Sequence, residues 1–146
     1  MTRYVLCAFT VLCLACSPYR ALRPASFTYT GAGGLRSVPL KVPRGWKATH
    51  DVPTADGAQC RFYRYRDSSV FYVAFLPSGG DLQPIDRSEH LPKLRPNGDT
   101  SYKQQAGDLY WREDKKGVLR AGYLNVPEGK PEMRFDSAVN FVNRQS

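Results

Sequence analysis

Apolar and polar residues alternate through the middle of this chain, which is the pattern of β-strands rather than of helices. The clearest case is residues 59–66 followed by 69–76, with Asp67 and Ser68 between them as a turn. Both faces of 69–76 are apolar, so we expect this strand to lie inside a sheet that is covered on both sides. These two stretches predict a central hairpin.

Four other stretches predict further strands. Residues 108–114 and 118–126 form a second expected hairpin, and residues 27–30 and 35–42 have the composition of strands. Pro39 has no N–H to donate to a neighbouring strand, so the strand that contains it is expected at a sheet edge.

Glycine- and proline-rich segments separate these strands. We interpret residues 31–34 as a turn, because no Lys-Ser or Lys-Thr pair follows, as a phosphate-binding loop would require. Residues 51–57 are expected to form a polar loop. Residues 77–99 contain four prolines, and the pattern favours a long loop with a short helix near Asp86. Loops of this length usually either form part of a binding site or extend into solvent.

The last predicted element is a helix that begins after Gly129. Pro131 suits its first turn, where a missing N–H costs nothing. Apolar residues then recur at the helical spacing, namely Phe135, Ala138, Val139 and Val142. The elements together predict an α+β fold, in which an antiparallel sheet of about five or six strands packs one face against this helix. Residues 27–146 are the expected single domain.

The first fifteen residues have the pattern of an export signal. Arg3 gives a positive start, and residues 5–15 form an uncharged apolar run. A run of about 11 residues fits a signal peptide and is shorter than the ~20 residues of a membrane-spanning helix. We therefore expect residues 1–15 to be removed and the mature protein to act outside the cytoplasm.

Residues 12–16, Leu-Cys-Leu-Ala-Cys, resemble the lipobox of bacterial lipoproteins. The resemblance implies that the Cys16 thiol is diacylated and that the signal is cut just before it. Two or three acyl chains hold a small domain on a membrane. Residues 16–26 would then form the lipidated start and a tether, with the domain in the cell envelope, facing the periplasm or the exterior.

Ordinary secretion without acylation is the alternative. Cys16 would then be available for a disulfide with Cys60 in an oxidising compartment. If Cys16 is acylated, Cys60 is either a buried apolar residue or a free thiol. The other two cysteines, Cys7 and Cys13, lie in the segment that is removed.

The mature segment resembles the antiparallel α/β/α sandwiches of the PsbP-like group. The resemblance rests on residues 42–46 (Val-Pro-Arg-Gly-Trp), on Gly122-Tyr123, and on Phe135-Asp136 at the expected helix. It implies a lumenal or periplasmic binding and assembly domain without catalytic residues.

Removing residues 1–15 leaves 131 of the 146 residues, with 20 basic and 13 acidic side chains and a net charge of +7. Such an excess either attracts anionic lipid or another polyanion, or is a soluble basic surface without a partner. Export from the cytoplasm argues against nucleic acid. Arginines alternate with tyrosines in 59–66, so Arg61, Tyr63 and Tyr65 form a possible exposed binding patch for an envelope protein.

No catalytic motif is found, and we therefore expect no enzyme, no cofactor and no metal site. We interpret His50 and His90 as surface residues, although together with Asp51 or Glu89 they would suit a metal if the loops met. The predicted function is a non-catalytic binding or assembly domain on a membrane. The alternative is a secreted or envelope enzyme that acts on an anionic polymer through these histidines.

Overall fold

The computed structural model describes residues 21–54, 56–80, 82, 93–94 and 99–145. Its main element is a seven-stranded antiparallel sheet in the order β3-β4-β5-β9-β8-β7-β6. The strands are β3 (Ala48–Pro53), β4 (Gln59–Arg64), β5 (Val70–Phe75), β6 (Lys93–Leu94), β7 (Thr100–Ala106), β8 (Leu109–Lys116) and β9 (Leu119–Pro127).

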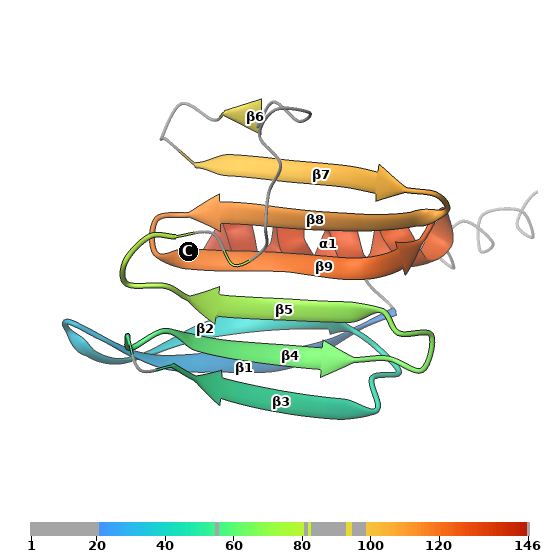
Figure 1. Cartoon of the computed structure of the whole chain (residues 1–146). Helices are drawn as coiled ribbons and strands as arrows, with labels where there is room; N and C mark the ends of the chain where they lie inside the picture. The colour runs from blue at the N-terminus through green and yellow to red at the C-terminus, as the bar shows by residue number, and fades with distance from the viewer. Residues whose placement is uncertain (1–20, 55, 81, 83–92, 95–98, 146) are drawn as a thin grey trace, which may run out of the picture.

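Two elements cover one face of this sheet. A separate hairpin of β1 (Leu22–Gly31) and β2 (Gly34–Pro43) lies behind β3, β4 and β5, and helix α1 (Lys130–Gln145) lies behind β8 and β9 (Figure 1). The helix also contacts β2, so the two elements adjoin each other. We call this side of the sheet the covered face. The expected α+β class, with the C-terminal helix on one face of an antiparallel sheet, is confirmed.

The hydrophobic core lies between the covered face and these two elements. The sheet contributes Phe71, Val73 and Tyr123, each 0% exposed. The helix contributes the four residues of the predicted stripe, Phe135, Ala138, Val139 and Val142, all of which are buried. Both predicted hairpins are confirmed as β4–β5 and β8–β9.

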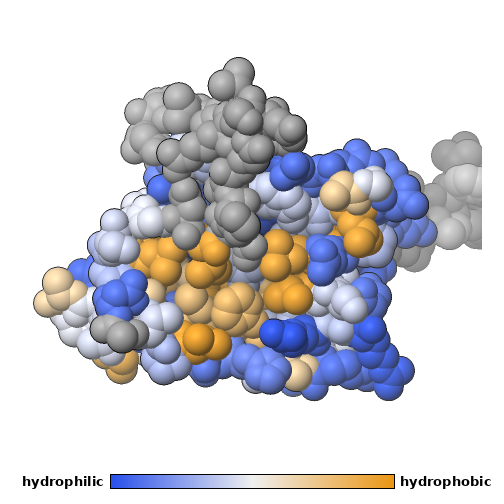
Figure 2. All heavy atoms as spheres, viewed as in Figure 1, coloured by the Kyte–Doolittle hydropathy of each residue, from blue (hydrophilic) through white to orange (hydrophobic). Residues whose placement is uncertain are grey.

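The opposite side, which we call the second face, is also apolar near β4 and β5. Ala58, Cys60, Ala74 and Leu76 form a small buried cluster there, with Phe62 and Leu82 packed against it. Figure 2 shows apolar residues gathered on this side of the molecule. Strand β5 is therefore covered on both sides, as its sequence predicts. Cys60 is a free, buried thiol.

The structure differs from the sequence-based expectation in three places. Strand β1 begins at Leu22, which is buried and pairs with Pro43, so residues 22–26 belong to the domain and not to a tether. Residues 51–53, expected in a polar loop, are the end of edge strand β3. Strands β6 and β7 had no predicted counterpart.

Several expectations concern residues outside the described part of the chain. The signal segment 1–15, Cys16 and the short helix near Asp86 all fall there. They remain predictions from the sequence.

Candidate functional site

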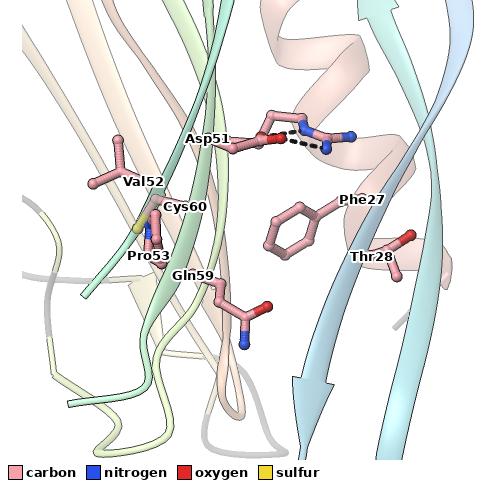
Figure 3. A pocket seen from close by; sticks show the side chains of 8 residues that line it. Phe27, Thr28, Asp51, Val52, Pro53, Gln59 and Cys60 are labelled. Atoms are coloured by element: carbon pink, nitrogen blue, oxygen red, sulfur yellow. Dashed lines mark hydrogen bonds and ion pairs between the residues drawn. The ribbon is translucent and has the colours of Figure 1, made fainter. Parts of the chain in front are cut away.

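A pocket of about 210 Å³ lies between the free edge of β1 and the sheet edge formed by β3 and β4. Figure 3 shows the Phe27 ring and the Gln59 side chain in the space between the two sheets, below Asp51. The lining residues are Phe27, Thr28, Asp51, Val52, Pro53, Gln59, Cys60 and Arg61. The pocket exists because β1 pairs with β2 and is not hydrogen-bonded as a strand to β3.

Two side chains of β4 join this edge of β1 to the main sheet. Gln59 accepts a hydrogen bond from the Thr30 N–H and donates one to the Thr30 carbonyl, both at 3.2 Å. Arg61 donates from Nη1 to the Ser26 carbonyl at 2.7 Å. Backbone N–H and C=O groups alternate in direction along a strand, so those of Ser26, Thr28 and Thr30 all face the same edge of β1. We call these contacts the Gln59–Arg61 bridge.

Arg61 also forms an ion pair with Asp51 across β3 and β4. Its Nε and Nη2 donate to the two carboxylate oxygens at 2.6 and 2.8 Å, a two-pronged contact that fixes the guanidinium plane. The hydrogen bond from Arg61 lowers the pKa of Asp51. The Asp51 side chain is 59% exposed and that of Arg61 is 26% exposed. Solvent screens such a pair, so its main effect is to orient Arg61.

The structure does not present Arg61, Tyr63 and Tyr65 as an exposed patch. All three lie on the covered face. Tyr63 is 3% exposed and packs edge-on against Trp46. Tyr65 is half-buried, contacts the Phe135 ring and donates its hydroxyl to the Pro43 carbonyl at 2.6 Å. The tyrosines support the fold, and Arg61 lines the pocket between β1 and the sheet edge.

A second polar cluster lies under α1. Arg112 donates to both oxygens of Asp114 at 2.7 Å, to Asp136 at 2.9 Å and to Asn140 at 2.8 Å. Tyr123 donates its hydroxyl to Asp136 at 2.9 Å. Burial opposes the charged form of Asp136, but hydrogen bonds from Lys103, Arg112 and Tyr123 outweigh it and lower the pKa of this carboxyl. We call these residues the helix network.

A third polar group crosses the second face. Tyr72, Gly122 and Glu113 are register partners on β5, β9 and β8. The Tyr72 hydroxyl passes over Gly122 and donates to Glu113 at 2.7 Å, and both side chains are 0% exposed. Glu113 also accepts the Leu82 N–H. Burial, followed by the charge of Glu113, raises the pKa of Tyr72 well above its usual range.

Arg120 is fully buried beside this row on the second face. Its guanidinium donates to the carbonyls of Gly79 and Gly80 and to that of Gly117. The buried charged groups described so far thus connect separate segments of the chain. Sequence patterns did not single them out, because their pairing depends on which strands become neighbours.

A larger and more open pocket, of about 510 Å³, lies at the end of the molecule where β1 begins. It is lined by Arg23, Arg44, Gly45 and Trp46. The Arg23 guanidinium lies 5.6 Å from the centre of the Trp46 ring, within the range of a cation–π contact. The Arg44 N–H donates to the Ala21 carbonyl, which places Arg44 beside the first described residue.

The predicted surface position of one histidine is confirmed. His50 is exposed on β3, and neighbouring Asp51 pairs with Arg61. His90 and Glu89 lie outside the described residues. Within residues 21–54, 56–80, 82, 93–94 and 99–145, no group of three or more potential metal-ligating side chains is found. No helix in the same part of the chain has the length and apolar character needed to cross a membrane.

Comparison with known proteins gives one partial similarity. The chain is 31% identical over 96 residues to an alpha-amylase of Aeromonas hydrophila, a match that covers 64% of this chain and 18% of that protein. No family model and no solved structure matches. The chain thus spans less than a fifth of the length of the curated relative that it matches.

Proposed function

We propose that this protein is an envelope lipoprotein in which acyl chains on Cys16 hold a non-catalytic binding domain at a membrane. The observation that carries the proposal is the apolar signal-like segment that ends at Cys16 in a lipobox-like sequence. The start of β1 at Leu22 supports it, because the folded domain then begins within a few residues of the anchor.

The use of the buried charges supports a non-catalytic role. Catalytic acids and bases need access to substrate. Arg112, Glu113 and Arg120 are instead each at least nine-tenths buried and hydrogen-bonded between elements. They are positioned to hold the domain together. The pocket beside the Gln59–Arg61 bridge is the proposed ligand or partner site, because a charged pair and an aromatic ring meet there.

Cell fractionation tests the anchor. Wild-type protein is expected in the membrane fraction, and the Cys16→Ala variant is expected to leave it. Cys60→Ala is the matched control, because it changes the other cysteine of the mature chain and leaves the acylation site intact. Equal membrane recovery of Cys16→Ala and wild type would contradict the anchor.

A charge reversal tests the pocket. Asp51→Lys places a cation at its rim and repels Arg61, so partners recovered from detergent-solubilised membranes are expected to be lost. Asp108→Lys, at an exposed position away from the pocket, makes the same charge change and is the control. Unchanged partner recovery by Asp51→Lys, with a native circular-dichroism spectrum, would remove this pocket as the site.

An enzyme that acts on an anionic polymer is the second candidate. The similarity to part of an alpha-amylase favours testing it, although that match covers a small share of the relative. Hydrolysis assays of the mature protein on acidic polysaccharides, with His50→Ala and His90→Ala variants, address it directly. Activity that disappears with either histidine would replace the binding proposal.

A further inference from the structure

Basic side chains gather at the end of the molecule where β1 begins. The turn between β2 and β3 and the turn between β4 and β5 lie at this same end (Figure 1). The exposed basic residues there, which we call the cationic end, are Arg23, Arg44, Lys47, Arg64 and Arg66.

Backbone contacts establish that these residues are neighbours. The Lys47 N–H donates to the Arg64 carbonyl at 2.7 Å, and Arg66 follows two residues later. Arg23 and Arg44 line one pocket, and Trp46 stands in the chain between Arg44 and Lys47. Five cations thus follow one another around the end of the two sheets.

Acidic residues do not neutralise this surface. Asp67, which follows Arg66, uses its carboxylate to accept the Ser69 N–H at 3.0 Å. No ion pair joins any of the five cations to an acid among the described residues, whereas Arg61 has one ion pair and Lys103 and Arg112 have two each. The cationic end is therefore available for anions from outside the chain.

The position of the cationic end relative to Cys16 decides which anions lie close to it. Arg44 is hydrogen-bonded to Ala21. The six residue-to-residue steps from Cys16 to Leu22 span at most about 22 Å. If Cys16 carries acyl chains, this end of the domain is held within about three Debye lengths of the headgroups, each ~8 Å at physiological ionic strength. The opposite end of the hairpin, at Arg36, is a further seven residues away along β2.

We propose that the cationic end docks on an anionic phospholipid surface, with headgroup phosphates bound by Arg23 and Arg44 beside Trp46. This inference rests on the proposed lipid anchor, which brings the surface to the membrane. Arginine binds phosphate oxygens with two parallel hydrogen bonds. A tryptophan ring suits the boundary between headgroups and acyl chains. The docked domain would be oriented with β1 toward the bilayer.

Vesicle sedimentation tests the proposal without the anchor. The probe is a chain of residues 16–146 with Cys16→Ala, which keeps every described residue and carries no lipid. It is expected to bind vesicles of phosphatidylcholine with phosphatidylglycerol, and not vesicles of phosphatidylcholine alone. Binding is expected to weaken when ionic strength rises from about 0.1 M to about 1 M, because the Debye length falls from ~10 Å to ~3 Å.

A pair of double variants separates this surface from net charge. Each basic residue near an anionic surface contributes about five-fold to partitioning, so Arg23→Gln with Arg44→Gln is expected to lose about 25-fold. Arg36→Gln with Arg144→Gln removes the same charge at the far end, where Arg36 and Gln145 line another pocket. This control is expected to lose less than about five-fold. Equal losses in both variants would overturn the proposal.

Tryptophan fluorescence reports which surface touches the lipid. The chain has two tryptophans, so Trp111→Phe leaves Trp46 as the sole emitter. Its emission is expected to shift to shorter wavelength with anionic vesicles. Vesicle binding without this shift would overturn the proposal, and so would tight binding of a soluble acidic polysaccharide in place of vesicles. Vesicle binding that persists when the native protein carries no acyl group would support the surface and contradict the anchor.

Discussion

The two elements on the covered face are joined to the sheet by different chemistry. Helix α1 is held by its buried apolar stripe and, in addition, by the helix network, in which Arg112 and Asp114 have side chains only 10% and 2% exposed. The β1–β2 hairpin is held mainly by aromatic and aliphatic packing, with Phe27, Tyr29 and Phe75 stacked in a row. Its polar contacts to the sheet include the partly exposed Gln59–Arg61 bridge.

This difference assigns different roles to the two halves. A buried charge network loses much stability when one member is removed, because the partners are left unpaired away from water. A half-exposed bridge loses little, because water replaces the missing partner. The helix half is therefore suited to a fixed frame. The hairpin half, which contains both the pocket at Asp51 and the cationic end, is suited to binding.

The largest expected effect is at Gly122, where the two halves meet. A Cβ atom there would lie 2.2 Å from the Arg112 carbonyl oxygen and 2.4 Å from the Tyr72 hydroxyl. Because one of these atoms belongs to the backbone, Gly122→Ala is expected to lower the free energy of unfolding by about 4 kcal/mol or more. Urea denaturation measures it.

Gly33→Ala is the control for that substitution. A Cβ at Gly33 meets only the flexible end of Arg36, at 3.1 Å. A change within about 0.5 kcal/mol is expected there, as for other surface sites. Gly122→Ala with wild-type stability would show that β5, β9 and β8 do not pack as described.

The second-largest effect is expected for a substitution in the helix network. Arg112→Met removes the partner of Asp114 and Asp136 and is expected to cost about 3–5 kcal/mol. The measurement is the free energy of unfolding from urea titration. A loss below about 1 kcal/mol, the range of an exposed pair, would contradict the contrast between the two halves.

The third prediction concerns the Gln59–Arg61 bridge. Gln59→Ala and Arg61→Ala are each expected to cost about 1 kcal/mol, because each removes hydrogen bonds that water partly replaces. Hydrogen exchange at the Thr30 amide should become faster in Gln59→Ala, since its acceptor is lost. Unchanged exchange at Thr30 would mean that Gln59 does not join β1 to the sheet.

The smallest effects are those of pH. The pKa of Asp136 lies below its ordinary value of 3.8 in the folded protein, so its ionised form stabilises the fold above that pH. This contribution is lost as pH falls through the lowered folded-state pKa. Asp136→Asn is therefore expected to flatten the fall in stability below about pH 4. Asp51→Asn, at a largely exposed site, is expected to change the loss of stability at acidic pH less than Asp136→Asn does. Thermal unfolding across this pH range measures both.

The sequence predicted the local elements well because their signals are local. The helical spacing of Phe135, Ala138, Val139 and Val142 is set within one segment, and the structure confirms it. The alternation in 59–66 and 69–76 likewise predicted a hairpin correctly. A strand of seven residues with polar side chains on both faces, such as β7, carries no such signal.

The sites were harder to predict because they depend on distant neighbours. The alternation placed Tyr63 on one face of β4, but nothing in it showed that the β1–β2 hairpin covers that face. The contact of Tyr72 with Glu113 requires β9 to insert between β5 and β8 with Gly122 at the right register. The grouping of Arg23 and Arg44 with Lys47 and Arg64 depends equally on how the hairpin and sheet pack.

The proposed anchor requires that Cys16 carries fatty acyl chains at the start of the mature protein. The most direct measurement is the intact mass of the protein purified from native membranes. We expect a chain that begins at Cys16 and is heavier than its sequence by two or three acyl groups. A full-length product that retains Met1, recovered from the cytosol without added mass, would contradict it.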